Sequence, residues 1–274
     1  MTAYLGPLGN LVGFACPSEE QIEQADNVST EVTLGGVQKA QYGQRAPRSW
    51  RVGIGTATPE QVGALTGLLR GLYGPPPWTY VGPWAQVSNL LTPAASLFLP
   101  GSSWFSPSGA VASGAVEIDG APTPSYSLID ASAGNTYTAP FPVVPGIPVT
   151  ASVWAKGNTS YSLSIAYINT AGTYFAGSPV KAFPAPASGP LVRNSVTATP
   201  PAGAATARLL ITGALRMAQP AATWTQDTAP WVAGEGAPTV IARGLSKAVQ
   251  LAVRESPAMR RTSASFTLDE VGNA

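Results

Sequence analysis

Only one stretch of this chain, residues 58–74, repeats its apolar side chains at the spacing of an α-helix. Five of them fall on one helical face: Val62, Leu65, Leu68, Leu69 and Leu72. Thr58 is suited to the N-cap position, and Gln61 completes a capping box. Gly74 and the prolines at 75–77 predict the end of the helix. Because helical periodicity is confined to this segment, the chain is predicted to be mainly β.

Three glycines inside this segment, Gly63, Gly67 and Gly71, lie four residues apart. Each costs about 1 kcal/mol relative to alanine inside a helix. We hypothesise that another backbone, either a strand or a neighbouring subunit, packs closely against them. The alternative is a surface helix with small side chains. Membrane insertion is not expected, because the segment is shorter than the ~20 residues that span a bilayer and includes Glu60 and Arg70.

The composition excludes several classes of protein. Charged residues make up 11% of the chain and the net charge is +1, so no broad field attracts nucleic acid or anionic lipid. The absence of histidine excludes Ser-His-Asp and Cys-His catalytic sites and histidine-bound zinc. Cys16 is the single cysteine, so no internal disulfide is expected. We expect no cofactor and no metal. The N-terminus lacks the features of a signal peptide, so export by that route is not expected.

The two ends of the chain are predicted to form one β-rich domain. Residues 49–54 alternate apolar and polar side chains, as a half-buried strand does. Residues 249–253 and 262–268 do the same and predict a hairpin. A lone hairpin is barely stable, so it must pair elsewhere, most simply with N-terminal strands. We therefore assign residues 1–85 plus 238–274 to one split domain.

The segment between these ends, residues 86–237, is predicted to be an inserted β-sandwich. It is rich in Ser, Thr, Ala and Pro, and short strands recur in it between turn signals. This spacing is typical of a sandwich or jelly roll. Its aromatic residues within strands, such as Trp154 and Tyr167, are expected in the core. Four others lie between predicted strands and are candidates for a glycan-binding platform: Trp104, Phe105, Tyr174 and Phe175. The alternative is that these four close the ends of the sandwich or contact a neighbouring protein.

Catalysis is not expected. A glycosidase needs two carboxylates across the scissile bond. The insertion contains only five carboxylates: Glu117, Asp119, Asp130, Asp227 and Glu235. Glu117 and Asp119 would lie on one strand face, but they precede Gly120 and fit a solvated turn.

Several motifs resemble known proteins. Thr56–Pro83 and Ala252–Gly272 resemble segments of the distal tail (Dit-type) protein, a minor tail protein of long-tailed, siphovirus-like bacteriophages. Val144–Gly157, Val196–Ile211 and Asp227–Gly236 resemble motifs of galactose-binding-like carbohydrate-binding jelly rolls.

This resemblance implies a structural virion protein, made in the host cytoplasm, at the tail tip. The split domain would form a ring with itself, usually a hexamer, that joins the tail tube protein to the hub and fibre proteins. Arg254, Arg260 and Arg261 would contact acidic partner surfaces, although a solvated strand face explains each of them as well. The insertion would bind host glycans. The alternative function is a stand-alone, non-catalytic carbohydrate-binding module.

Overall fold

Antiparallel strands make up most of the regular secondary structure, which confirms the mainly β prediction. The computed structural model describes residues 2–15, 17–24, 28–32, 38–42, 47–99, 104–105, 111–118, 121–129, 135–156, 160–183, 190–213, 216–251 and 261–271. Contacts divide the chain into two compact units. Unit 1 comprises Met1–Pro7, Val12–Tyr80 and Pro238–Ala274, and unit 2 comprises Leu8–Leu11 and Val81–Ala237. That the domains 1–85 plus 238–274 and 86–237 are separate functional modules stays a prediction.

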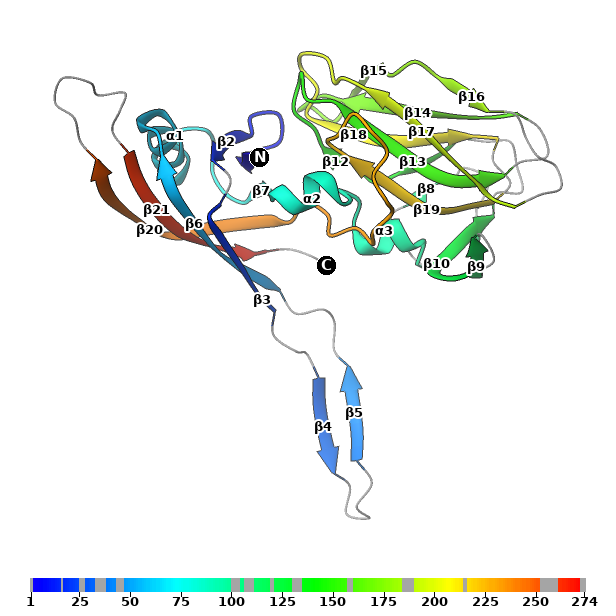
Figure 1. Cartoon of the computed structure of the whole chain (residues 1–274), viewed down its shortest axis with the longest axis horizontal. Coiled ribbons are helices and arrows are strands. Elements are labelled where there is room, and N and C mark those ends of the chain that lie inside the picture. Colours follow the sequence, from blue (N-terminus) through cyan, green and yellow to red (C-terminus); the bar gives the residue numbers. More distant parts are fainter. Residues whose placement is uncertain are drawn as a thin grey trace. The chain divides into compact units, whose positions relative to one another are not determined.

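Unit 1 is built on a seven-stranded sheet. Its strands are β1 (Thr2–Gly6), β2 (Val12–Ala15), β3 (Glu19–Gln24), β6 (Arg48–Ala57), β7 (Trp78–Val81), β20 (Thr239–Leu251) and β21 (Arg261–Glu270). Their order is β2-β1-β7-β20-β21-β6-β3 (Figure 1). Because β21 pairs with both β20 and β6, the C-terminal hairpin joins an N-terminal strand, as expected. β4 (Val28–Val32) and β5 (Gln38–Tyr42) form a separate two-stranded sheet.

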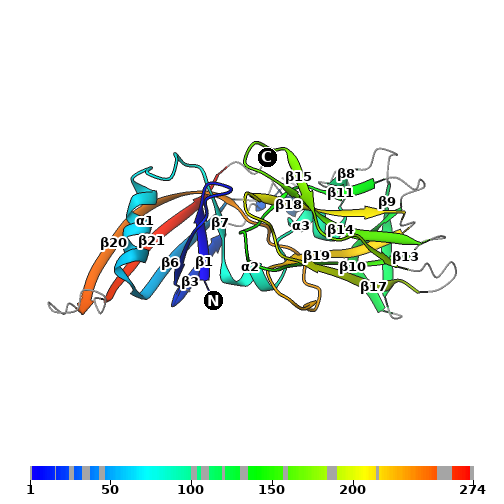
Figure 2. The ribbon, with the colours of Figure 1, turned by 90° about the horizontal axis from the view of Figure 1, so that it is seen from above.

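The core of unit 1 comes from alternate strand residues, because successive side chains of a strand point to opposite faces. The buried residues of β6 and β21 include Trp50, Val52, Ile54, Phe266 and Leu268. Leu65 and Leu68 of the helix α1 (Pro59–Leu69) belong to the same core cluster. Figure 2 shows α1 beside β6, β20 and β21. Burial of one helical face against this sheet confirms the amphipathic character of the segment.

Helix α1 begins as its sequence predicts. Thr58 adopts an extended conformation and its hydroxyl accepts a hydrogen bond from the Gln61 backbone nitrogen. In return, the Thr58 backbone nitrogen donates to the Gln61 side-chain oxygen at 3.1 Å. Both halves of the capping box are therefore present, and they satisfy two N–H groups that the first helical turn leaves without partners.

The end of α1 differs from the prediction, which placed it at Gly74. The last helical residue is Leu69, and Gly71 adopts a left-handed conformation with φ of +76°. The backbone nitrogen of Leu72 donates to Gly67 and that of Gly71 donates to Leu68, at 2.9 and 2.8 Å. These two bonds form a Schellman motif, in which glycine is favoured because it lacks a Cβ. Leu72 therefore leaves the apolar face and is 77% exposed.

The three glycines have separate surroundings in the described part of the chain. Gly71 ends the helix, and a Cβ at Gly63 would have no atom within 4 Å. A Cβ at Gly67 would lie 3.0 Å from the Tyr73 ring, so Gly67 makes room for a side chain rather than a backbone. No strand of the described chain packs against all three glycines. Packing of a neighbouring subunit there stays a prediction.

Unit 2 contains two short helices that helical periodicity did not reveal, α2 (Pro83–Val87) and α3 (Pro93–Leu97). Each has five residues, which is too few for a periodic pattern to be recognised. The sequence pattern therefore indicated neither of them. No helix among the described residues is long and apolar enough to cross a membrane.

Two sheets of unit 2 form the predicted sandwich. The first, β17-β13-β19-β10-β9, contains β9 (Val111–Ile118), β10 (Ala121–Ile129), β13 (Val149–Lys156), β17 (Val192–Ala198) and β19 (Arg216–Thr223). The second, β15-β14-β18-β11-β8, contains β8 (Trp104–Phe105), β11 (Asn135–Thr138), β14 (Tyr161–Ile168), β15 (Tyr174–Gly177) and β18 (Thr206–Thr212). β12 (Phe141–Pro142) and β16 (Lys181–Phe183) pair with β18 and β14.

The core of unit 2 follows the same alternation. The fully buried residues of β13 are Val149, Ala151, Val153 and Ala155, and those of β14 include Leu163 and Ile165. The intervening residues of β14, such as Ser162 and Ala166, are partly exposed. The second sheet of unit 2 therefore has one face in the core and an opposite face, called here the outer face.

Candidate functional site

The residues of the outer face follow from the strand register, since directly paired residues lie on the same face of a sheet. Ala166 of β14 pairs with Arg208 of β18, and Ser164 pairs with Leu210. Leu210 in turn pairs with Tyr137 of β11, which pairs with Phe105 of β8. Four strands thus place side chains on one surface.

Three of these side chains form a continuous row, called here the aromatic–arginine row: Phe105, Tyr137 and Arg208. The centroids of the Phe105 and Tyr137 rings are 4.9 Å apart, and their planes are inclined by 32°. The guanidinium carbon of Arg208 lies 5.0 Å from the centroid of the Tyr137 ring. Phe105 is 53% exposed, which leaves one end of the row open to solvent.

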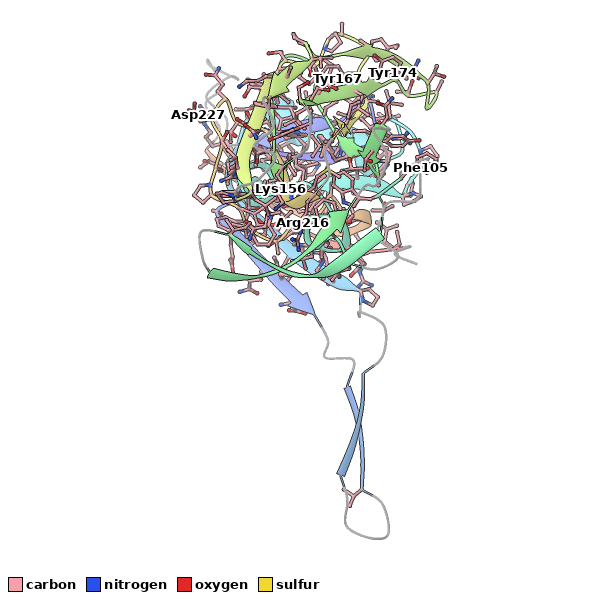
Figure 3. All side chains as sticks on the ribbon, turned by 90° about the vertical axis from the view of Figure 1, so that its right-hand side faces the viewer. Phe105, Lys156, Tyr167, Tyr174, Arg216 and Asp227 are labelled. Carbon is pink, nitrogen blue, oxygen red and sulfur yellow. The ribbon has the colours of Figure 1, made fainter. Side chains whose placement is uncertain are left out.

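Tyr174 lies at the opposite edge of the same face. It pairs with Ile168 at an irregularity of β15 and is 63% exposed, and its neighbour Phe175 is 41% exposed. Figure 3 shows Phe105 and Tyr174 on one side of unit 2, with Asp227 on the other. β8 and β15 are separated by four inter-strand spacings of about 4.8 Å, or roughly 19 Å. An oligosaccharide can bridge such a distance, whereas a single sugar cannot.

The four predicted aromatic residues do not form one platform, because they occupy opposite edge strands. Trp104 also differs in role from the other three. It pairs with Thr138, which is buried, and its indole nitrogen donates to the Ala95 carbonyl at 2.8 Å. Its ring lies 4.6 Å from the ring of buried Phe98. Trp104 is therefore partly buried against the interior, which fits the alternative that it closes one end of the sandwich, and its role in glycan binding stays a prediction.

Polar groups flank the aromatic–arginine row. The Thr212 hydroxyl donates to the Asn135 side-chain oxygen at 2.7 Å, and the two residues pair across β18 and β11. Asn135 is exposed, and its amide nitrogen makes no hydrogen bond with the described residues. The face thus combines apolar rings with a small number of hydrogen-bonding groups, as ligand sites commonly do.

Of the two strand aromatics expected in the core, Tyr167 is buried there, whereas Trp154 lies on the opposite face of β13 from the core residues Val153 and Ala155. Tyr167 is 1% exposed, and burial raises the pKa of its hydroxyl to about 12. Trp154 is partly buried and packs against Ile118, Leu191 and Ala218. Neither ring is available to a ligand on the outer face.

The carboxylates of unit 2 are dispersed where the structure describes them. Asp227 is exposed and Glu235 is partly buried, and both lie in the segment that follows β19. Asp119, Asp130 and the side chain of Glu117 lie outside the described residues. Within the described residues, no group of three His, Cys, Asp or Glu side chains could hold a metal ion.

Of the three arginines predicted to contact partner proteins, only one lies within the described residues. Arg261 is half-buried at the start of β21. Hydrogen bonds at the helix start, from the Glu60 backbone and from Thr58, lower the pKa of Glu60, with a smaller contribution from the charge of Arg261. Arg254 and Arg260 lie outside the described residues.

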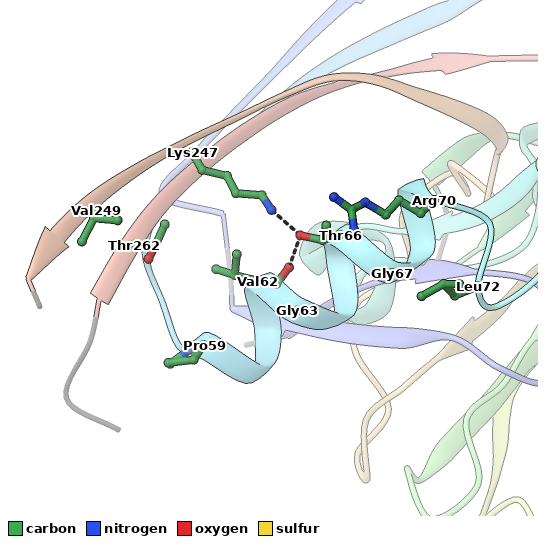
Figure 4. Close-up of a pocket in the computed structure, with 10 residues that line it drawn as sticks. All are labelled: Pro59, Val62, Gly63, Thr66, Gly67, Arg70, Leu72, Lys247, Val249 and Thr262. Atoms are coloured by element: carbon green, nitrogen blue, oxygen red, sulfur yellow. Dashed lines mark hydrogen bonds between the residues drawn. The ribbon is translucent and has the colours of Figure 1, made fainter. Parts of the chain in front are cut away.

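A groove of about 420 Å³ runs beside α1 in unit 1 (Figure 4). Gly63 and Gly67 lie along it, and Lys247 and Val249 of β20 form its other wall. The Lys247 ammonium donates to the Thr66 hydroxyl, which itself donates to the Val62 carbonyl at 2.6 Å. Two of the predicted assembly glycines therefore border a surface depression.

Sequence reasoning missed Tyr137 and Arg208 as site residues. The alternation in Thr206–Thr212 does place Arg208 on the face opposite Ala207, Leu209 and Ile211, which are buried. What the pattern does not contain is the register between strands, and only that register brings Tyr137 and Phe105 beside Arg208.

No protein-family model and no curated protein matches the sequence. Among solved structures, the chain is similar to the enzymatically active domain of tailspike protein 4 of bacteriophage CBA120, with 14% identity and a TM-score of 0.37. That alignment covers 49% of this chain and 21% of the tailspike chain, so this chain spans about a fifth of its match.

Two further similar structures are carbohydrate-binding modules. One is a CBM4 structure with 15% identity, a TM-score of 0.29 and coverage of 51% of this chain and 92% of that chain. The other is a module of the β-sandwich superfamily with 10% identity, a TM-score of 0.31 and coverage of 76% and 96%. The chain is distantly similar in structure to carbohydrate-binding β-sandwich modules and to a phage tailspike domain.

Proposed function

We propose that unit 2 is a non-catalytic glycan-binding module whose ligand lies across the outer face. The observation that supports this most directly is the aromatic–arginine row, with Phe105 half exposed and stacked against Tyr137. Aromatic rings favour the apolar C–H surface of a sugar, and nearby amide and hydroxyl groups can hydrogen-bond its hydroxyls. Asn135 and Thr212 are placed for that second role.

The proposal makes Phe105 the main apolar contact. Covering an exposed aromatic side chain is worth about 1.5–3 kcal/mol, so Phe105→Ala is expected to weaken glycan binding by roughly tenfold to a hundredfold.

Tyr174→Ala should weaken binding of long oligosaccharides more than short ones, because Tyr174 lies at the far edge of the sheet. A glycan array, followed by calorimetry on each retained glycan, measures both effects.

Trp84→Ala is the matched control for these variants. Trp84 is 56% exposed and belongs to α2, which contacts β19 of the other sheet rather than the outer face. The Trp84→Ala variant should leave glycan binding unchanged. Retention of no glycan, or equal binding by the Phe105 and Trp84 variants, would contradict the proposal.

A second proposal concerns unit 1, which we infer to be an assembly domain of a phage tail tip. The supporting observation is that β4 and β5 pair only with each other in the described sheet topology. A two-stranded hairpin alone is marginally stable, and β2 and β3 also leave sheet edges available. A ring of copies would cover these strands. With the distal-tail resemblance of Thr56–Pro83, this supports a six-fold ring between the tail tube and the hub or fibre proteins.

Light scattering and averaged electron micrographs of the full chain, alone and mixed with tail tube protein, test this assembly. A ring is expected. Replacing Val28–Tyr42 with a short Gly-Ser link should abolish the ring while leaving the thermal unfolding of both units unchanged, because the hairpin pairs with no other described strand. A particle that stays monomeric in the presence of tail tube protein would refute the ring and leave unit 2 as a stand-alone binding module.

A further inference from the structure

The outer face of unit 2 carries a positive charge with no described counter-charge. The ion pairs among the described residues, Arg48–Glu270, Arg51–Glu23 and Arg243–Asp269, all lie in unit 1. In the described part of unit 2, no carboxylate lies within 4.0 Å of the Arg208 guanidinium. The Nε of Arg208 is buried and makes no hydrogen bond with any residue that the structure describes.

Arg208 therefore has a hydrogen-bond donor that no described residue satisfies. A partly buried guanidinium loses hydration, and contact with the Tyr137 ring replaces only part of it. A planar guanidinium matches the two oxygens of a carboxylate or phosphate.

The residues paired with Arg208 across the sheet are small. The neighbour of Arg208 in the register is Ala166, and the neighbour of Ala166 on β15 is Gly177. A Cβ at Gly177 would lie 3.1 Å from the Tyr174 hydroxyl, so that hydroxyl extends over Gly177. The positions paired directly with Arg208 across β14 and β15 therefore carry only a methyl group and a hydrogen.

We propose that the glycan bound by unit 2 is acidic, and that Arg208 binds its anionic group while Tyr137 and Phe105 contact the adjoining sugar. This inference rests on the proposed glycan-binding function. The anion is a carboxylate, as in a uronic acid, or a phosphate, as in a sugar-phosphate polymer, since both offer paired oxygens of negative charge. The Tyr174 hydroxyl supplies a further hydrogen bond from the other side of Ala166.

The test uses the full chain on an array that holds neutral, uronate-containing and phosphate-containing glycans. Wild-type protein is expected to retain members of an acidic set. Arg208→Gln should weaken that binding at least tenfold, and Arg208→Lys should weaken it less because the charge remains. Arg216→Gln, which changes an arginine of β19 in the other sheet, is the matched control and should have no effect.

Chemical change of the glycan gives a test that does not depend on how the variant folds. Reducing the carboxyl group of a retained uronate to an alcohol should lower binding as much as Arg208→Gln does, and removing the phosphate should do the same for a retained phosphate polymer. Retention of neutral glycans alone, with Arg208→Gln equal to wild type, would refute the acidic ligand while the glycan-binding proposal stands. Retention of no glycan would refute both.

Discussion

Asn89→Ala is expected to remove a large fraction of the stability of unit 2. Asn89 is fully buried, and its amide nitrogen donates to the carbonyls of Pro220 and Val232 at 3.1 and 3.0 Å. Its side-chain oxygen accepts from the backbone nitrogens of Leu91 and Ala222, both at 3.1 Å. One side chain therefore satisfies four backbone groups in the segment between α2 and α3, in β19 and in the segment after β19.

The expected magnitude follows from those four groups. Leaving a buried donor or acceptor unpaired costs about 1–3 kcal/mol, so the loss should be about 4 kcal/mol or more. A domain is stable by about 5–15 kcal/mol, so such a loss is a large fraction of the total. Close packing at Gly234 prevents relaxation, because a Cβ there would lie 1.9 Å from the Leu91 carbonyl oxygen.

Urea unfolding followed by tryptophan fluorescence measures this loss. Asn135→Ala is the control, since Asn135 is exposed and its described side-chain bond is a single one to Thr212. That variant should lose less than about 1 kcal/mol, as surface substitutions usually do. Equal stabilities of the two variants would show that the four buried bonds of Asn89 contribute little.

Glu270→Ala is expected to have a comparable effect on unit 1. Glu270 and Arg48 form a buried ion pair in which the Arg48 Nε lies 3.1 Å from Glu270 Oε2, with side-chain exposures of 7% for Arg48 and 3% for Glu270. The Arg48 backbone nitrogen also donates to Glu270 Oε2 at 2.9 Å. Removing one partner of a buried pair costs about 3–5 kcal/mol, because the other charge is left buried without compensation.

The neighbouring pair of Arg243 and Asp269 provides the control. The Arg243 side chain is 70% exposed, so Arg243→Gln should lose at most about 1 kcal/mol. Replacing both buried partners, as Arg48→Met with Glu270→Leu, should destabilise unit 1 less than Glu270→Ala alone, because no unpaired charge remains. A double variant as unstable as the single one would mean that backbone hydrogen bonds to Glu270, rather than the charge, hold this end of the sheet.

The sequence alone determined the features that depend on near neighbours. The alternation in residues 49–54 and 262–268 predicted the strands β6 and β21, because side chains of a strand alternate between two faces. Thr58 and Gln61 predicted the start of α1, because a capping box needs only residues three positions apart. The same local signals failed at the helix end, since the helix ends at Leu69 and Gly71, rather than Gly74, is the left-handed residue that follows its C-cap.

Tertiary structure decided everything that depends on which distant residues meet. Arg48 and Glu270 are 222 residues apart in the chain, and Asn89 bonds across 131 residues to Pro220. Phe105, Tyr137 and Arg208 form one row only because β8, β11 and β18 pair in a particular register. A shift of that register by one residue would move the side chains of a strand to the other face, so no local pattern contains this information. Of the strands of the candidate site, β14 and β18 were predictable, whereas β8 and β15 were not, since their aromatic residues were expected between strands. The surface that these strands form was not predictable either.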